Sequence, residues 1–231
     1  MYNFDYQRPA DRAAATAAFK GDARYLAGGQ SLVQAMKMRL SNAERLVDLA
    51  AIADLKAIKA DASGVTVGAM ATHASVAASA DVRKAIPALA ELAGGIGDAM
   101  VRNMGTIGGS IANADPAACY PAGLVGLGAT VHTNQRTIAA DAFFTGLYET
   151  ALKSGELITA VSFPLVQKAA YIKYKQPASR FALVGVFVSQ SSGGVRVAVT
   201  GAKGSVFRVP ELEAALAKSF MPEAVKGVKL S

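Results

Sequence analysis

Val101-Arg-Asn-Met-Gly-Thr-Ile-Gly-Gly-Ser-Ile-Ala-Asn-Ala-Asp-Pro116 contains a glycine pair that matches a second pair in Ala27-Gly-Gly-Gln-Ser-Leu32. A peptide N–H approaches an anion closely where no Cβ intervenes and where successive amides turn inward, and glycine satisfies both conditions. Ser31 precedes an apolar-periodic run, so it is expected to be a helix N-cap with free amides beside it. Gly28-Gly29 and Gly108-Gly109 are therefore predicted to form two backbone cradles for one diphosphate.

Polar side chains around the second pair extend this predicted site. Thr106 and Ser110 add hydroxyl donors, and Asn113 and Asp115 offer hydrogen bonds to a sugar or to a further phosphate oxygen. A nucleotide diphosphate is the ligand that this set favours. Glycine pairs also mark ordinary turns and helix ends, so that interpretation stays open for each pair alone. Neither pair belongs to a G-x-G-x-x-G or P-loop motif.

The composition indicates a globular protein. The chain has 231 residues, of which 52% are hydrophobic. Its longest apolar run, 181–188, is far shorter than the roughly 20 residues of a membrane helix, and the N-terminus lacks a signal-peptide pattern. We therefore expect a cytoplasmic protein without a membrane span. The net charge of +7 comes from scattered Lys and Arg, which favours an acidic partner subunit over nucleic acid.

Few residues are suited to bind a metal or to act as acid or base. The single Cys119 excludes an internal disulfide and, by itself, an iron–sulfur or zinc site. His73 and His132 have no Cys, Asp or Glu at ligand spacing, and we expect both to be structural or surface groups. No metal site and no catalytic residue is predicted, so any redox metal must lie on another chain.

Hydrophobic periodicity predicts alternating helices and strands, followed by strand pairs. The predicted helices cover 10–20, a run from 32, 82–93, a run through 124, and 210–217. The predicted strands cover 24–27, 46–49, 58–60, 65–69, 129–133, 157–163, 172–175, 182–190 and 195–201, the last two joined by a hairpin turn at 191–194. This order is typical of an α+β protein that opens with a βαβ-like unit.

The two glycine stretches, together with other short motifs along the chain, resemble those of the FAD-binding medium subunit of the molybdenum hydroxylases, the xanthine dehydrogenase and carbon monoxide dehydrogenase group. The resemblance runs from Phe4 to about Gly204. Its ordered landmarks are Arg8-Pro9, Ala27-Gly-Gly-Gln-Ser-Leu32, Leu46-Val-Asp-Leu49, Val67-Gly-Ala-Met-Ala-Thr-His73, residues 101–122, Gly155-Glu-Leu-Ile158 and Lys175-Gln-Pro-Ala-Ser-Arg180.

The resemblance implies a fold of three units. A two-subdomain FAD-binding fold of the PCMH type, residues 1–55 and 56–167, would be followed by a small α+β C-terminal domain, residues 168–231. Family members typically continue into a last helix, so that domain is expected to be shortened or the sequence to be incomplete.

The resemblance also implies which residues contact FAD. Residues 27–32 and 106–110 would line the pyrophosphate and ribityl chain, Ile96 and Ile158 would make apolar contacts, and Lys175 would place a cation near the flavin. Phe181 matches an aromatic that caps the isoalloxazine, although Phe181 and Ile96 also suit the protein core. His73, in a landmark near the cofactor, can approach the flavin. The predicted set is Ala27, Gly28, Gly29, Gln30, Ser31, Leu32, Ile96, Thr106, Ile107, Gly108, Gly109, Ser110, Asn113, Asp115, Cys119, Ile158, Lys175 and Phe181.

One position departs from the family pattern. Relatives commonly carry Asp where this chain has Cys119, and a thiol accepts hydrogen bonds from a ribose poorly. Asp115 can take over that role, or it can be a helix N-cap followed by proline at N1.

The function that the resemblance implies is electron transfer. A large subunit with the molybdenum cofactor would oxidise the substrate, and a small subunit would carry electrons through two [2Fe–2S] clusters. This FAD subunit would then pass them to NAD, a quinone or another acceptor, and a dimer of such heterotrimers is expected. Two alternatives stay open: a stand-alone flavin oxidoreductase, and a scaffold subunit that has lost its cofactor.

Overall fold

The chain opens with a small parallel sheet. In the computed structural model, which describes residues 1–229, its strands lie in the order β1-β3-β2. They are β1 (Asp5–Gln7), β2 (Ala23–Leu26) and β3 (Arg45–Asp48). The connections carry α1 (Arg12–Ala18) and α2 (Leu32–Lys37), so the predicted βαβ-like unit is confirmed. The sequence analysis missed β1, because three residues that are not buried give no periodic signal.

The start of α2 differs in part from the prediction. Ser31 occupies the N-cap position, as predicted, but it has helical backbone angles and its side chain makes no capping hydrogen bond. The turn begins earlier, since the N–H of Val33 already donates to the carbonyl of Gly29 at 3.2 Å. In α1, by contrast, the Asp11 carboxylate caps the helix by accepting from the N–H of Ala14 at 2.8 Å.

A second sheet forms the middle of the molecule, with strand order β4-β5-β10-β6-β7 and antiparallel pairing throughout. All four predicted strands here are confirmed, and β7 was missed. Its strands are β4 (Ile58–Asp61), β5 (Gly64–Gly68), β6 (Thr130–Thr133), β7 (Thr137–Ala139) and β10 (Ile158–Pro164). The same part of the chain contains η1 (Ala53–Lys56), η2 (Ala140–Ala142) and a separate two-stranded sheet of β8 (Phe144–Gly146) and β9 (Glu149–Thr150).

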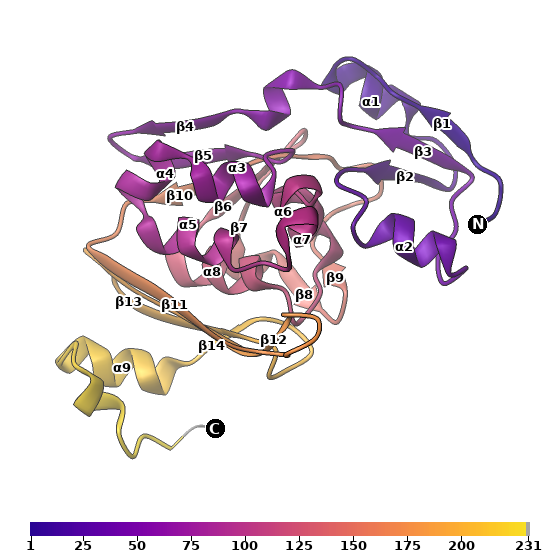
Figure 1. Ribbon diagram of the computed structural model, residues 1–231. Coiled ribbons are helices and arrows are strands. Elements are labelled where there is room, and N and C mark those ends of the chain that lie inside the picture. Colours follow the sequence, from indigo (N-terminus) through magenta and orange to yellow (C-terminus); the bar gives the residue numbers. More distant parts are fainter. Residues whose placement is uncertain (230–231) are drawn as a thin grey trace.

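Helices pack beside this sheet (Figure 1). The predicted helix over 82–93 is two helices, because Pro87 starts a new helix and holds the preceding Ile86 outside helical angles. A further helix before it was missed, and it ends at Ser79, which also caps the next one. The helices are α3 (His73–Ala78), α4 (Ala80–Ala85), α5 (Pro87–Gly94), α6 (Ala99–Met104), α7 (Ile107–Asn113) and α8 (Cys119–Leu127).

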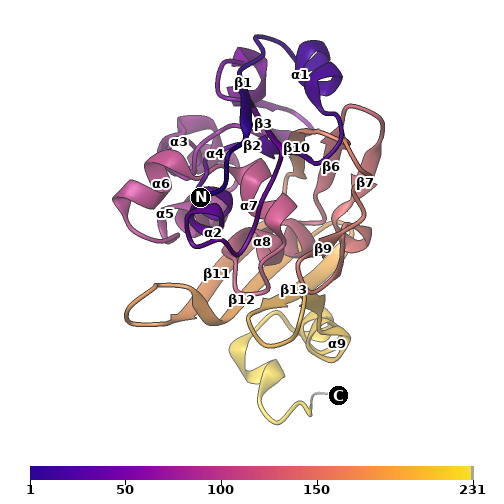
Figure 2. The same ribbon diagram turned by 90° about the vertical axis from the view of Figure 1, so that its right-hand side faces the viewer.

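The C-terminal part is an antiparallel sheet with α9 on one face and α8 near the other (Figures 1 and 2). Its predicted strands, its turn at 191–194 and its helix are confirmed. The elements are β11 (Lys168–Lys175), β12 (Ala182–Ser191), β13 (Gly194–Thr200), β14 (Phe207–Arg208), α9 (Pro210–Lys218) and η3 (Pro222–Val225).

One aromatic residue joins this sheet to the middle of the molecule. Phe187 of β12 is fully buried in the same hydrophobic cluster as α5, α7 and α8. A Cβ on Gly126 of α8 would lie 2.7 Å from Cδ1 of Phe187, so the ring occupies the space that a side chain at Gly126 would need. This contact places the C-terminal sheet directly against the last turn of α8.

Candidate functional site

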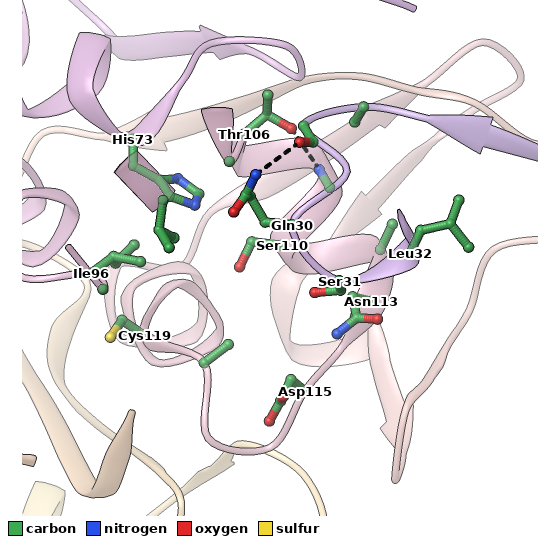
Figure 3. Close-up of a pocket in the computed structure, with 18 of the residues that line it drawn as sticks. Gln30, Ser31, Leu32, His73, Ile96, Thr106, Ser110, Asn113, Asp115 and Cys119 are labelled. Carbon is green, nitrogen blue, oxygen red and sulfur yellow. Dashed lines mark hydrogen bonds between the residues drawn. The ribbon is translucent and has the colours of Figure 1, made fainter. Parts of the chain in front are cut away.

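A cavity of about 410 Å³ lies where the loop between β2 and α2 meets α6 and α7 (Figure 3). The two glycine stretches reach it because their backbones touch. A Cβ on Gly28 would lie 2.1 Å from the carbonyl oxygen of Met104, so only glycine allows this approach. The predicted pairing of the two stretches is therefore observed. The predicted residues that line this cavity are Ala27, Gly28, Gly29, Gln30, Ser31, Leu32, Ile96, Thr106, Gly109, Ser110, Asn113, Asp115, Cys119 and Phe181.

The first stretch offers free backbone donors. Gly29 has a positive φ of 70°, which turns the chain before α2. Within residues 1–229, the N–H groups of Gly29, Gln30 and Ser31 donate to no protein acceptor. Three successive unpaired amides on a cavity wall are suited to bind phosphate oxygens.

The second stretch is not an amide cradle. Its glycines lie in the first turn of α7, and protein acceptors already satisfy the amides there. The N–H of Ile107 donates to Ala71 O at 3.1 Å, that of Gly108 to Ala69 O at 2.8 Å, and that of Gly109 to Thr106 Oγ1 at 3.1 Å. The glycines instead allow close packing, since a Cβ on Gly108 would lie 2.7 Å from both the carbonyl oxygen and the Cβ of Ala69.

Side chains supply polar groups on this side of the cavity. Ser110 and Asn113 of α7 form no hydrogen bond with another described residue through their side chains, so both are available to a ligand. Asp115 accepts from the N–H of Ala117 at 2.8 Å, and α8 begins only at Cys119 with Ala118 as its N-cap. The alternative that Asp115 caps a helix with proline at N1 is therefore wrong.

A second cavity, of about 390 Å³, adjoins the first. Both are lined by Arg24, Tyr25, Ala27, Gly109 and Ala112, so these residues form the boundary between them. Gly108 and Ile158 line the second cavity only. The two adjoining cavities form one continuous site, and the free amides lie on the wall of the first, which matches a ligand with two bulky ends joined by phosphates.

Three predicted residues lie in the core, at the rim of the first cavity or outside both cavities. Ile107 is fully buried and lines neither cavity. Phe181 is 48% exposed at the rim of the first cavity, so the alternative that it belongs to the core is wrong. Lys175 is exposed and lines neither cavity. A register shift between Tyr174 and Lys175 interrupts the alternation of β11 at that point.

Lys173 lines the cavity instead, and sequence reasoning missed it. Its Nζ donates to Gly95 O and to Arg180 O, both at 2.8 Å, and lies 3.4 Å from Cys119 Sγ. It therefore links the end of α5, the start of α8 and the loop between β11 and β12. The sequence feature that could have revealed Lys173 is its position two residues after Tyr171, which puts both on the partly buried face of the strand.

Replacing Lys173 with methionine should loosen the loop at 176–181. Loss of these hydrogen bonds removes about 1 kcal/mol of local stability, which is roughly a fivefold rise in opening. Limited trypsin digestion followed by mass spectrometry should show cleavage after Arg180 about five times faster. Lys168→Met, on the exposed end of the same strand, is the control, and equal rates in the two variants would contradict the role assigned to Lys173.

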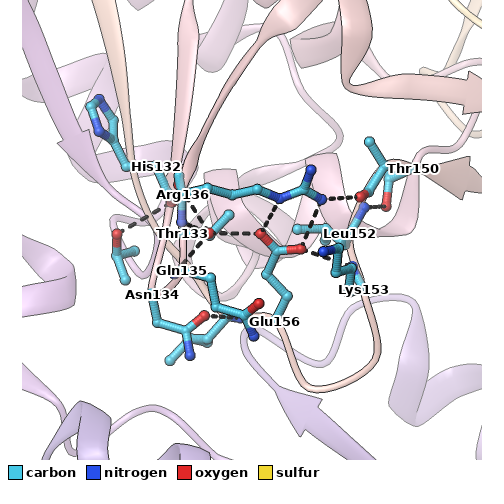
Figure 4. Close-up of polar contacts among 12 residues, drawn as sticks. His132, Thr133, Asn134, Gln135, Arg136, Thr150, Leu152, Lys153 and Glu156 are labelled. Atoms are coloured by element: carbon cyan, nitrogen blue, oxygen red, sulfur yellow. Dashed lines mark hydrogen bonds and ion pairs between the residues drawn. The ribbon is translucent and has the colours of Figure 1, made fainter.

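Glu156 anchors the wall of the second cavity (Figure 4). Its side chain is fully buried and accepts from Arg136 Nε at 2.9 Å, Arg136 Nη2 at 3.0 Å, Thr133 Oγ1 at 2.8 Å and the N–H of Lys153 at 2.8 Å. These hydrogen bonds, chiefly those from Arg136, lower the pKa of Glu156 to about 2. The carboxylate thereby fixes the segment 153–158 against the turn between β6 and β7.

Glu156→Gln should lower the free energy of unfolding by about 2 kcal/mol at pH 7, because the charge is lost and an amide N–H₂ then faces donors. Urea unfolding measures this loss. Glu91→Gln changes an exposed glutamate of α5 and should leave the stability within about 0.5 kcal/mol of the original. A loss at Glu156 no larger than that at Glu91 would show that the network contributes nothing.

The two histidines differ in position. His132 in β6 contacts Ser162 Oγ at 2.8 Å and belongs to the sheet, as expected. His73 is 5% exposed, lines the first cavity, and its ring centroid lies 5.3 Å from that of Tyr120. Burial, aided by the nearby Arg102, lowers the pKa of His73 to about 4, so the imidazole is neutral at physiological pH.

Residues 1–229 contain no group of three or more His, Cys, Asp or Glu side chains arranged to hold a metal ion. No helix within the same residues has the length and apolar character needed to cross a membrane.

Comparison with known proteins gives the family. Residues 2–166 match the family described as the FAD binding domain in molybdopterin dehydrogenase. The carbon monoxide dehydrogenase medium chain of Afipia carboxidovorans is 38% identical over 202 residues, which are 83% of this chain and 70% of that protein. The glyceraldehyde dehydrogenase medium chain of Sulfolobus acidocaldarius is 33% identical over 82% of this chain and 72% of that one.

Solved structures agree with this result. A carbon monoxide dehydrogenase from Hydrogenophaga pseudoflava that lacks the Mo-pyranopterin moiety of its cofactor superimposes with a TM-score of 0.90 at 35% identity, covering 97% of this chain and 84% of that chain. The predicted α+β FAD-binding fold is thus confirmed. With two thirds of its length in the family match and a 38% identical medium chain among its relatives, this chain belongs to the FAD-binding domain family of the molybdopterin dehydrogenases.

Proposed function

We propose that this chain is the flavin electron-transfer subunit of a molybdenum-containing hydroxylase or dehydrogenase. In that complex, electrons from the [2Fe–2S] clusters of a small partner subunit leave through this chain to an external acceptor such as NAD or a quinone. A large partner subunit holds the molybdenum cofactor and oxidises the substrate. The assembly is a dimer of heterotrimers in the cytoplasm. The medium-chain names of the relatives support this proposal.

The residues present fit FAD. The observation that carries the proposal is the pair of adjoining cavities, with the unpaired amides of Gly29, Gln30 and Ser31 on the wall of the first. Ser110 and Asn113 add uncommitted polar side chains, whereas Ile96 and Phe181 add apolar surface for a flat ring. When bound, FAD supplies redox chemistry that accepts electrons singly or in pairs.

The protein part of the function is binding, orientation and exclusion of water. The three amides hold a diphosphate near Arg24, a cation that lines both cavities, while Ala27 and Gly109 lie at the boundary between the cavities. Arg102 fixes the position of Ile96, since its Nη1 donates to Ile96 O at 3.0 Å and to Gly97 O at 2.9 Å. As part of the same proposal, residues 1–55 and 56–167 form the two subdomains of the FAD-binding fold, and 168–231 a small domain that flanks the first cavity.

The test is the visible absorption spectrum of the chain purified with its natural partners, followed by heat release of the cofactor. About one FAD per chain, with iron–sulfur absorbance in the partners, is the expected result. A colourless chain in an intact, metal-loaded complex would instead identify a scaffold subunit. A yellow chain that purifies alone and reduces its flavin with a small substrate would identify a stand-alone oxidoreductase.

A further inference from the structure

His73 occupies an unusual place in the cavity wall. It is the first residue of α3, and its N–H donates to Gly105 O at 2.9 Å. The side chain packs over Gly105, where a Cβ would lie 2.5 Å from His73 Nε2. Figure 3 shows the imidazole reaching from α3 toward the space bounded by Gln30, Ile96 and Thr106. The glycine just before Thr106 is therefore needed to accommodate an imidazole at this point.

The imidazole has hydrogen-bonding capacity that the protein does not use. Nδ1 is buried and has no hydrogen-bond partner among the described residues. The hydroxyl of Tyr120, whose ring packs against the imidazole, is also buried and has no hydrogen-bond partner among them. A buried polar atom without a partner costs free energy, and such atoms are rare in folded proteins. Because the ring is neutral, one nitrogen donates and the other accepts. Nε2 also has no partner among the described residues but is not enclosed in this way, so it is the nitrogen that the polar ring edge of a ligand in the cavity can reach.

We propose that His73 is a positioning residue of the cofactor site, where its imidazole hydrogen-bonds the polar edge of the isoalloxazine ring. This inference rests on the function proposed above. The first cavity suits the flavin end of FAD because its rim, which includes the exposed Phe181, lies at the protein surface. An electron acceptor can approach the flavin there. The second cavity, walled by the buried Glu156 and Leu157, then receives the adenosine end.

The experiment measures binding of FAD and of its two halves, FMN and ADP, to the full chain by fluorescence and calorimetry. His73→Phe keeps the ring shape and removes both nitrogens. It should weaken FAD and FMN about tenfold and leave ADP unchanged. His73→Gln restores a neutral donor and acceptor, so FMN affinity should return to within about threefold of the original. Tyr120→Phe removes the hydroxyl behind the ring, lines neither cavity, and serves as the matched control.

A second measurement does not depend on any variant folding. In the original protein, labelled with ¹⁵N in histidine, addition of FMN should shift the ring resonances of His73 and leave those of His132 in place. Unshifted resonances, or equal FMN affinity in His73→Phe and Tyr120→Phe, would overturn the assignment. A loss confined to ADP would overturn the placement of the flavin end. Failure of the original chain to bind FAD at all would instead refute the function on which the inference rests.

Discussion

Gly109→Leu is expected to reduce FAD affinity by more than 100-fold while the chain stays folded. A Cβ at this position would lie 3.0 Å from Thr106 Oγ1 and 3.3 Å from Ala27 Cβ. Because Gly109 lines both cavities, a larger side chain there must occupy space at the boundary between them. FAD would then lose the continuous site that both of its ends require, which corresponds to at least about 3 kcal/mol of binding free energy.

The measurement is flavin content per chain after desalting, together with a titration of the apoprotein with FAD. Circular dichroism verifies that the fold persists. Gly94→Leu makes the same exchange at an exposed position of α5, where the nearest atom to a new Cβ is 3.7 Å away, and should keep its FAD. Gly109→Ala should have an intermediate effect. Full FAD content in Gly109→Leu would remove this glycine from the binding site.

The second large effect concerns pH. The pKa of His73 is about 4 in the folded protein and 6.5 for an unperturbed histidine. Between these values the unfolded chain binds a proton that the folded chain does not, so the free energy of unfolding rises with pH in this window. Stability should therefore fall by about 3 kcal/mol as pH decreases from 6.5 to 4, with about 2 kcal/mol of that loss reached by pH 5.

Urea unfolding of the original chain and of His73→Gln at several pH values isolates this contribution, since glutamine does not titrate. Glu156 titrates alike in both proteins, so its contribution cancels in this comparison. Its lowered pKa means that its contribution is present above pH 4.5 and is lost only as pH falls toward 2. Parallel curves for the two proteins between pH 5 and 7 would show that His73 is not buried as described.

Sequence reasoning found the elements whose signals are local. The strand runs at 65–69, 157–163 and 182–190 alternate or are strongly apolar, and each appears as a strand. The glycine stretches were also identified correctly as neighbours. Short elements such as β1 and β7 are stabilised by pairing with distant strands, so their own three residues carry no pattern.

The errors at the site have physical causes of the same kind. Whether Gly108 and Gly109 offer free amides depends on acceptors at Ala69 and Thr106, and no spacing rule reveals those contacts. Lys175 was chosen because its motif matched the family, but it lies beyond the register shift after Tyr174 and lines neither cavity, whereas Lys173 keeps the regular alternation of β11 and lines the first cavity. His73 could not be assigned from its sequence context because its burial and its unpaired nitrogen arise only from tertiary packing.

The seat of Phe187 against Gly126 bears on how this protein can be recombined with its relatives. The C-terminal sheet is formed by one continuous part of the sequence. Its residue Phe187, however, packs against α8 in the space that the missing side chain of Gly126 leaves free. A chimera that imports 168–229 from a homologue must therefore import a compatible α8 as well. A crossover point before Cys119 takes Gly126 and Phe187 from the same parent protein. A crossover at 167 takes them from different parents, so the Phe187 ring can meet a side chain in place of Gly126.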